Sequence, residues 1–224
     1  MICLLPGCSD SMSAPGRAAL DLVILTADKN TQFGLEGLLT DPARLKIRNT
    51  ESKTLVHPRR DPGVLRQCHE FLRSQQRVAA RALVIFDREG CGSDHDRDAL
   101  EGEVEKRLAQ NGWQDRSAAI VIDPELEAWV WGEYTQIAGV LGWSRAGLTL
   151  REWLMQECFL QHGQQKPDRP KEALKHMLYT LRTPRSSSIY LDLASRMSFD
   201  RCTDPAFLKL KSTLQSWFPP EAHS

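Results

Sequence analysis

The sequence lacks a long hydrophobic run, because no segment approaches the ~18 consecutive apolar residues that a membrane-spanning helix needs. It also lacks net charge: 29 Lys and Arg residues balance 29 Asp and Glu residues, so no global positive field indicates a nucleic-acid-binding protein. The six cysteines form no CxxC pair and the six histidines form no HxH or HExxH motif, which argues against a zinc site. The phosphate-binding G-x-x-x-x-G-K-[ST] motif and the G-x-S-x-G motif of serine hydrolases are missing too. We therefore expect a cytoplasmic protein with free thiols.

The remaining composition is that of a globular protein with a full core, since 41% of the 224 residues are hydrophobic and 26% are charged. Residues 1–17 are interpreted as a disordered leader, and Met12 is an alternative start. The change in sequence pattern after Asp123 predicts an α/β core over residues 18–132 and a helical C-terminal region over residues 133–224.

Three apolar runs organise the first half of the chain, and an acidic residue follows each of them. Residues 20–25 precede Asp28, residues 82–86 precede Asp87 and Glu89, and residues 118–122 precede the segment Asp123-Pro124-Glu125-Leu126-Glu127. Continuous apolar runs of this length are typical of strands buried on both faces of a parallel sheet. Parallel strands end at the same edge, where open α/β sheets place ligands and chemistry.

Helical periodicity separates these strands and dominates the rest of the chain. Helices are predicted over residues 31–39, 64–76 and 97–111, with Asn30 or Thr31 as the first N-cap and a further strand within 45–48 or 54–57. The resulting β-α-β order predicts a parallel, Rossmann-like sheet flanked by helices, with a mainly helical C-terminal half. The later helices are expected at 126–132, 137–141, 150–160, 171–181, 189–197 and 205–218.

Converging carboxylates repel one another, and in proteins they commonly hold a hard cation. We expect Asp28, Asp87 and Glu89 to bind Mg²⁺ or Mn²⁺ and Glu127 to assist in catalysis. The alternative is that these acids cap helices, which is the role expected for Asp94 and Asp96. His57 and His95 are candidates for a general base or a phosphate contact, although a surface or core role is the more common one.

Positive charge near the predicted site falls in two places. Lys29 and Arg88 adjoin the acids and are expected to neutralise phosphate. Lys166, Arg169 and Lys171 form a basic segment, in which Pro170 at a helix start would leave free N–H groups for a phosphate. A solvated loop with ordinary surface lysines is the alternative.

The residues around Asp87 resemble the Toprim fold of topoisomerases, primases and the overcoming-lysogenization-defect (OLD) nucleases. In that family an acid after the first strand and a later D-x-D bind Mg²⁺; Asp28 matches the first acid, usually Glu, and Asp87 with Glu89 match the D-x-D. The segment 123–129 is similar to the P-x-x-E-x-W segment of RloB-like defence proteins. The whole chain resembles a small subunit of methylation-associated anti-phage defence systems.

The resemblance implies a Mg²⁺-dependent phosphodiesterase or nuclease that acts with other defence-system subunits, on DNA or RNA, and away from membranes. A homo-oligomer is also compatible with it. A second hypothesis is an inactive Toprim-like sensor or assembly subunit, favoured by the non-ideal acids and by the six Trp residues, a type enriched in interfaces. A third is that the acids only cap helices and the sheet edge binds a nucleotide signal through backbone amides.

Overall fold

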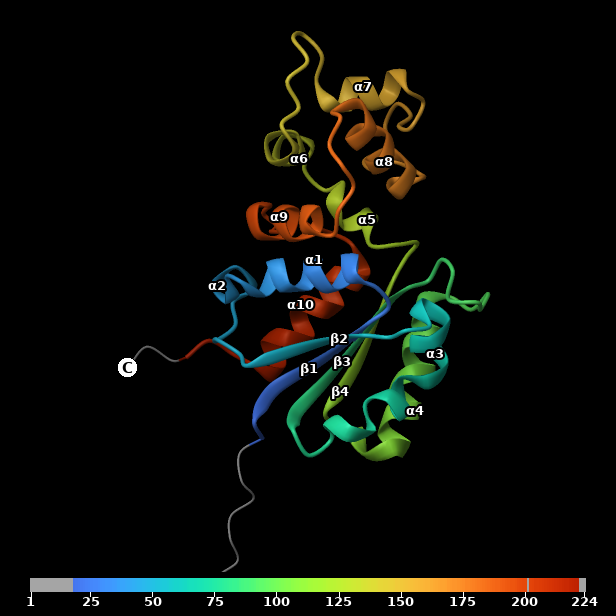
Figure 1. The fold of residues 1–224 in the computed structure, drawn as a ribbon, viewed down its shortest axis with the longest axis vertical. Coiled ribbons are helices and arrows are strands. Elements are labelled where there is room, and N and C mark those ends of the chain that lie inside the picture. The colour runs from blue at the N-terminus through green and yellow to red at the C-terminus, as the bar shows by residue number, and fades with distance from the viewer. Residues whose placement is uncertain (1–17, 201, 222–224) are drawn as a thin grey trace, which may run out of the picture.

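The computed structural model describes residues 18–200 and 202–221, so the expected leader at 1–17 lies outside the described residues. Its centre is a four-stranded parallel sheet with the strand order β2-β1-β3-β4 (Figure 1). The parallel α/β architecture expected from the sequence is therefore confirmed. The strands are β1 (Leu20–Thr26), β2 (Ser52–Val56), β3 (Ala79–Asp87) and β4 (Ser117–Ile122).

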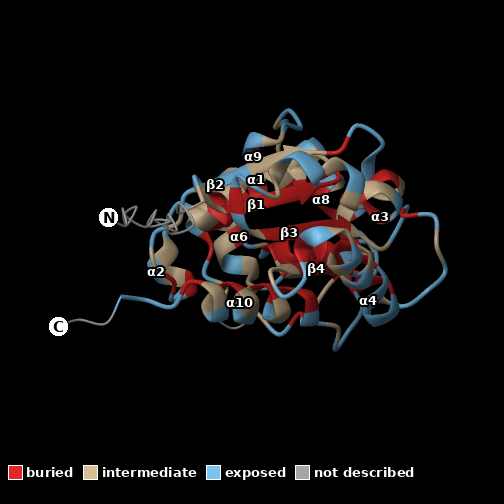
Figure 2. Ribbon diagram, turned by 90° about the horizontal axis from the view of Figure 1, so that it is seen from below, coloured by how far each residue is buried: buried red, intermediate tan, exposed pale blue. Residues whose placement is uncertain are grey.

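β1, β3 and β4 are buried on both faces, which explains why these three strands are continuous apolar runs rather than alternating ones. In β1, Leu22 and Ile24 belong to one core cluster, whereas Val23 and Leu25 belong to the other. The register aligns Ile24 with Leu83 of β3, so equivalent side chains of neighbouring strands share a face. Figure 2 shows the buried strands between helices on either side.

One face of the sheet packs against helices of the first half of the chain, α3 (Arg60–Phe71) and α4 (Arg97–Leu108). The other face packs against α1 (Lys29–Leu39) together with helices from the C-terminal end, α9 (Ser188–Arg196) and α10 (Pro205–Trp217). Figure 1 shows α9 lying against α1 and α10 behind the strands. The C-terminal region therefore completes the core of the sheet as well as extending from it.

The other C-terminal helices lie beyond the sheet, in the upper part of Figure 1. Among the residues that the structure describes, none of the helices is both long and apolar enough to cross a membrane. The remaining short elements are α2 (Pro42–Leu45), a 3-10 turn (Arg73–Gln75), an irregular turn (Ala109–Trp113), α5 (Glu127–Val130), α6 (Tyr134–Leu141), α7 (Leu150–Gln156) and α8 (Pro170–Thr180).

Several local expectations were wrong, among them the strand alternative at 45–48, where α2 ends, and the last part of the helix expected over 150–160, which stops at Gln156. The N-cap of α1 is Asp28, not Asn30 or Thr31, because the Asp28 carboxylate accepts the free N–H of Thr31. The helix expected from residue 64 begins at Arg60, four residues earlier. Pro62 does not prevent this, since the first turn of a helix needs no N–H donor from its residues.

The contact between α1 and α9 depends on Gly37. A Cβ atom placed on Gly37 would lie 2.6 Å from the carbonyl oxygen of Leu191 and 2.9 Å from the Cβ of Ala194. Gly37→Ala is therefore expected to push α9 away from the sheet and to destabilise the protein by about 1–3 kcal/mol, the usual range for overpacking. Urea denaturation followed by tryptophan fluorescence measures this change.

Gly34 on the same helix is the matched control for Gly37→Ala. A Cβ atom at Gly34 would meet only the Leu126 methyl groups, at 4.0 Å. Because Ala has the higher helix propensity, Gly34→Ala is expected to stabilise the protein by up to about 1 kcal/mol. Equal effects of the two substitutions would contradict the close packing of α1 against α9.

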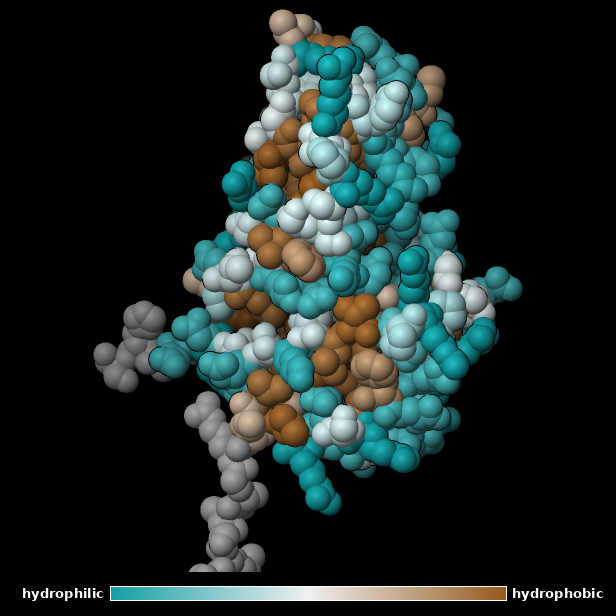
Figure 3. Space-filling view, viewed as in Figure 1, coloured by the Kyte–Doolittle hydropathy of each residue, from teal (hydrophilic) through white to brown (hydrophobic). Residues whose placement is uncertain are grey.

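The exposed hydrophobic side chains of residues 18–200 and 202–221 are scattered rather than gathered into one docking face. In the view of Figure 3 the hydrophobic surface is divided into several patches by hydrophilic side chains. Among the described residues, the exposed large hydrophobic side chains are Val78, Tyr179 and Leu208, on three different elements or loops. Single exposed hydrophobic residues are normal in soluble domains, so they do not by themselves mark an interface.

Candidate carboxylate site at the sheet edge

The strand order reverses between β1 and β3. The chain leaves β1 towards β2 on one side and later returns to place β3 and β4 on the other, with α1 and α3 on opposite faces. In open parallel sheets such a switch point leaves a crevice at the carboxyl ends of the strands, where ligands bind. Asp28 lies two residues after β1, and Asp87 is the last residue of β3, so both acids lie at the carboxyl ends of the two strands on either side of the switch point.

Asp28 is held by the start of α1. Its Oδ1 accepts hydrogen bonds from the backbone N of Thr31 at 2.9 Å and from the Thr31 hydroxyl at 3.0 Å. The capping role that the sequence left open for the acids therefore applies to Asp28. The cap occupies only Oδ1 of Asp28, because both hydrogen bonds end on that oxygen.

Asp87 connects three segments of the edge. Its backbone N–H donates to Asp61 Oδ1 at 2.9 Å, and its own Oδ1 accepts the N–H of Leu126 at 3.0 Å. Asp61 lies in the first turn of α3, where a carboxylate also complements the helix dipole. Gly63 allows this turn to approach the buried His57, since a Cβ atom there would lie 2.3 Å from the His57 ring.

The acids influence one another strongly. Burial raises the pKa of Asp87 well above its usual value, and the charges of Asp61, Glu127 and Asp28 raise it further. Burial also raises the pKa of Asp61, with a further contribution from Asp28. These four carboxyl groups therefore form one electrostatic unit, although they come from four separate segments of the chain.

Helices of the C-terminal region close the site. Glu125, which is 4% exposed, accepts the backbone N–H of Lys171 at 3.0 Å and the Lys171 ammonium at 2.8 Å. Glu127, which is 2% exposed, accepts a hydrogen bond from the Tyr190 hydroxyl at 2.5 Å. Burial raises the pKa of Glu127, while this hydrogen bond and the Lys171 charge oppose the rise.

The donor chemistry of the site suits a hard cation, since carboxylate oxygens are the ligands that Mg²⁺ prefers. The arrangement is not that of a finished metal centre: within residues 18–200 and 202–221, no three Asp, Glu, His or Cys side chains are grouped as a metal ion would require. Asp28, Asp61, Asp87 and Glu127 are the carboxyl groups at this edge that act on one another, and they are the residues that would hold such an ion. The ion would polarise a phosphodiester and orient a water molecule.

The other residues expected at the site are placed differently. Glu89 is exposed, and its backbone N–H donates to the carbonyl of Pro124 at 2.9 Å. Arg88 pairs with Asp123 through Nε and Oδ1 at 2.8 Å, and Lys29 is exposed beside Asp28. The structure therefore brings Asp28, Asp87 and Glu127 into one unit with Asp61, and it leaves Glu89 at the surface.

The three residues of the basic segment face different partners. Lys166 Nζ lies 3.7 Å from the buried Asp204, the N-cap of α10, and the Arg169 guanidinium lies over the Phe159 ring. Lys171 reaches into the carboxylate site. Pro170 does start α8 as expected, but Glu125 accepts the N–H of Lys171, so that N–H is not free for a phosphate.

The histidines and loop acids have local roles. His57 is buried, its Nδ1 accepts the N–H of Arg59, and burial lowers its pKa. His95 is exposed. Asp96 caps α4 through Ala99 N, as expected, whereas Asp94 is exposed and is not the N-cap.

Asp61, Lys171 and Tyr190 are the site residues whose roles sequence reasoning missed. Asp61 had a signal: it follows the second strand of the parallel sheet, as Asp28 follows the first. The sequence offered two alternative positions for that strand, 45–48 and 54–57, and therefore did not identify the acid that follows it. Tyr190 and the inward position of Lys171 had no local signal, because their partners lie 63 and 46 residues away in the chain.

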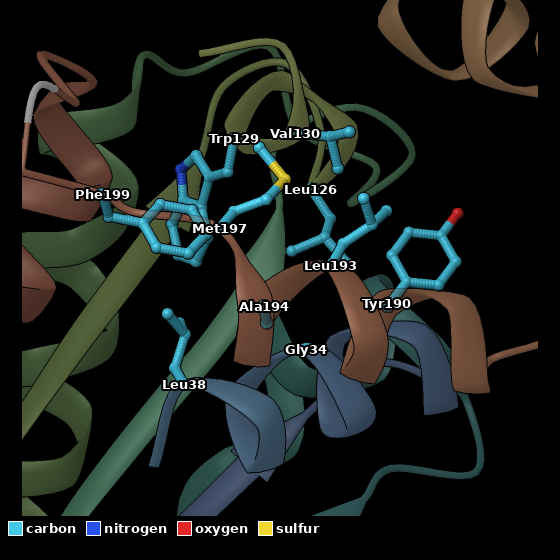
Figure 4. A pocket seen from close by; sticks show the side chains of 10 residues that line it. All are labelled: Gly34, Leu38, Leu126, Trp129, Val130, Tyr190, Leu193, Ala194, Met197 and Phe199. Carbon is cyan, nitrogen blue, oxygen red and sulfur yellow. The ribbon is translucent and has the colours of Figure 1, made fainter. Parts of the chain in front are cut away.

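A small apolar cavity adjoins the site, with a volume of about 30 Å³, and it lies between α1, the α5 region and α9. Figure 4 shows that the Tyr190 ring borders this cavity while its hydroxyl points away from it. Leu126 also lines it, next to the Asp87 hydrogen bond. An apolar cavity of this size is a packing defect rather than a ligand site.

Comparisons of the chain with family models, with curated proteins and with solved structures find no match.

Proposed function

We propose that this protein is a Mg²⁺-dependent phosphodiesterase or nuclease component of a prokaryotic anti-phage defence system, acting in the cytoplasm with other subunits of that system. The observation that supports it most is the position of Asp87 at the switch point of a parallel sheet, within the field of Asp28, Asp61 and Glu127. Carboxyl groups with raised pKa values in such a place are typical of functional sites rather than of helix caps.

The proposal assigns a role to each group. Asp28, Asp87 and Glu127 hold the cation, with Asp61 in the position that the D-x-D resemblance gives to Glu89. Tyr190 orients Glu127 through its hydrogen bond. Exposed cations near the edge, Lys29 and Arg169, contact the DNA or RNA backbone.

The experiment compares Asp61→Asn with Glu89→Gln. The purified protein is incubated with Mg²⁺ or Mn²⁺ and with supercoiled DNA or labelled RNA, and nicking is followed on gels. Asp61→Asn should reduce cleavage at least about 100-fold, on the scale of a lost catalytic group. Glu89→Gln should change the rate of cleavage by no more than a few-fold. Activity that survives Asp61→Asn but not Glu89→Gln would favour the D-x-D arrangement instead.

The second candidate function is an inactive sensor or assembly subunit of a larger defence complex. The observation that favours it is that Lys171 and Tyr190 already engage Glu125 and Glu127. A pull-down from the native host distinguishes the two: a stable large partner, together with no cleavage under any divalent cation, would favour the subunit function.

A further inference from the structure

Tyr179 lies in the last turn of α8, in the upper part of Figure 1. It is 82% exposed, whereas every other Phe, Trp and Tyr residue is buried or of intermediate exposure. The other two tyrosines use their hydroxyl groups inside the protein, since Tyr134 donates to the carbonyl of Gln165 and Tyr190 donates to Glu127. Within the described part of the chain, the Tyr179 side chain has neither a hydrogen bond nor a ring contact. Its ring is therefore free to contact a partner.

Two cations flank Tyr179. Lys175 lies four residues before it on the same face of α8, and Arg182 follows at the end of the helix. Both are exposed, and neither pairs with an acid among residues 18–200 and 202–221. From the start of α8 to the start of α9 the exposed charged residues are Arg169, Lys175, Arg182 and Arg185, against the single acid Glu172. This segment therefore presents positive charge, although the chain as a whole has no net charge.

Arg182 has a backbone conformation that usually belongs to glycine. Its φ is 54°, its N–H donates to the carbonyl of Tyr179 at 3.0 Å, and the N–H of Thr183 donates to that of Leu178 at 2.9 Å. These two bonds form the Schellman motif that ends many helices, in which glycine is common because it adopts positive φ without a steric cost. Among the described residues, no ion pair or hydrogen bond of the Arg182 side chain accounts for a cation at this position. A strained residue without an internal partner points to a role outside the fold.

An exposed aromatic ring between two unpaired cations matches the chemistry of single-stranded nucleic acid. The bases of a single strand stack on aromatic side chains whatever their sequence, while Lys and Arg contact the phosphates. In a duplex the bases are already stacked on one another, so Tyr179 would have no free base to contact. An acidic protein segment would pair with the cations but would leave the ring without a partner.

We propose that Lys175, Tyr179 and Arg182 form a binding site for single-stranded DNA or RNA. A base stacks on the Tyr179 ring, and the adjacent phosphates pair with Lys175 and Arg182. The site is separate from the carboxylate site, because Lys171, which contacts Glu125, lies about 12 Å from Tyr179 along the axis of α8. It requires neither a bound metal ion nor cleavage, and it therefore goes beyond the proposed function.

The ring is tested by fluorescence anisotropy with labelled oligo-dT and oligo-rU of about 20 nucleotides, at about 50 mM salt and with EDTA present. Tyr179→Ala should raise the Kd about tenfold, equivalent to about 1.4 kcal/mol, whereas Tyr179→Phe keeps the ring and should bind as the wild type does. Leu208→Ala removes another exposed hydrophobic side chain, from α10, and should have no effect. Since the site contacts no 2′-hydroxyl, the two oligonucleotides should bind with similar Kd values.

The cations are tested by the dependence of binding on salt. Lys175→Met and Arg182→Gly should each reduce the slope of log K against log salt by about 0.7, the value for one phosphate of a single strand. Arg182→Gly should leave Tm unchanged or higher, because glycine relieves the positive φ, so affinity falls without a loss of stability. Lys106→Met, at an exposed cation of α4, is the control for a general loss of positive charge and should leave the slope unchanged.

Four results would overturn this proposal: no binding by the wild type, a Kd that Tyr179→Ala leaves unchanged, competition by unlabelled duplex as strong as by unlabelled single strand, and equally strong competition by polyglutamate. The second and third would indicate attraction by charge alone, and the fourth would favour an acidic protein partner. None of them bears on cleavage, which the comparison of Asp61→Asn with Glu89→Gln measures. Binding that depends on Tyr179 in a protein that cleaves nothing would support this site and contradict the proposed enzyme.

Discussion

Asp87→Asn is expected to make the protein more stable at pH 7 and to abolish the metal-dependent cleavage that we propose. Burial and the charges of Asp61, Glu127 and Asp28 raise the pKa of Asp87 well above its usual value. The folded state therefore binds the proton more tightly than the unfolded state, and this advantage is lost as the pH rises through the folded-state pKa. Above that pKa the ionised carboxylate destabilises the fold, by about 1.4 kcal/mol for each pH unit that separates the folded-state pKa from the unfolded-state pKa.

An Asn side chain removes this charge but keeps the main contact of Asp87. Its amide oxygen can still accept the N–H of Leu126, as Asp87 Oδ1 does at 3.0 Å. The gain in stability should thus appear at pH 7 and shrink towards pH 4, as the wild-type carboxyl group takes up a proton. Each kcal/mol corresponds to a rise of about 2–4 °C in Tm for a chain of this size.

Thermal and urea denaturation in EDTA at both pH values measure the effect of Asp87→Asn. Asp192→Asn, at an exposed acid of α9, is the control and should change stability by less than about 0.5 kcal/mol. A lower stability of Asp87→Asn at pH 7 would show that the protein compensates the Asp87 charge, and the case for a functional site would weaken. Cleavage that persists in Asp87→Asn would exclude Asp87 from the reaction.

Three strands of the sheet, β1, β3 and β4, were predictable because they are buried on both faces. A short apolar run such as 118–122, followed directly by an acid and a proline, is too short for a helix and indicates a strand. Because the strands are parallel, Asp28 and Asp87 were expected at the same edge of the sheet. β2 was less certain because two of its five residues, Ser52 and Lys53, are exposed and carry no hydrophobic signal.

The site was only partly predictable, since its electrostatic partners come from distant segments. Spacing along the chain suggested Glu89 as the partner of Asp87, because residues two apart in a strand share a face. β3 ends at Asp87, and the chain then turns through Gly90, whose φ of 86° is in the left-handed region, so that alternation does not extend to Glu89. The first turn of α3 brings Asp61 to Asp87 instead.

The free edge of β4 is covered by side chains of α4. Glu101 Oε1 accepts the backbone N–H of Val121 at 3.0 Å, and Glu105 Oε1 accepts that of Ala119 at 3.0 Å. Lys209 of α10 bridges the two glutamates, at 3.0 Å from Glu101 and 2.8 Å from Glu105. β4 ends the strand order, so these acids satisfy N–H groups that would otherwise be open to pairing with another strand.

Glu101→Ala is therefore expected to destabilise the protein by about 3 kcal/mol or more, because it leaves Lys209 without its more buried partner and a buried N–H without an acceptor. Glu101→Gln should destabilise the protein less, since its amide oxygen can still accept the backbone N–H of Val121. Glu103→Ala on the same helix removes only a surface pair with Arg107 and should change stability by about 0.5 kcal/mol. Urea denaturation of the three variants measures these differences. If Glu101→Ala and Glu103→Ala lose the same stability, water replaces Glu101 as the acceptor for the N–H groups of β4. The contacts of Glu101 with β4 and with Lys209 of α10 would then add no stability.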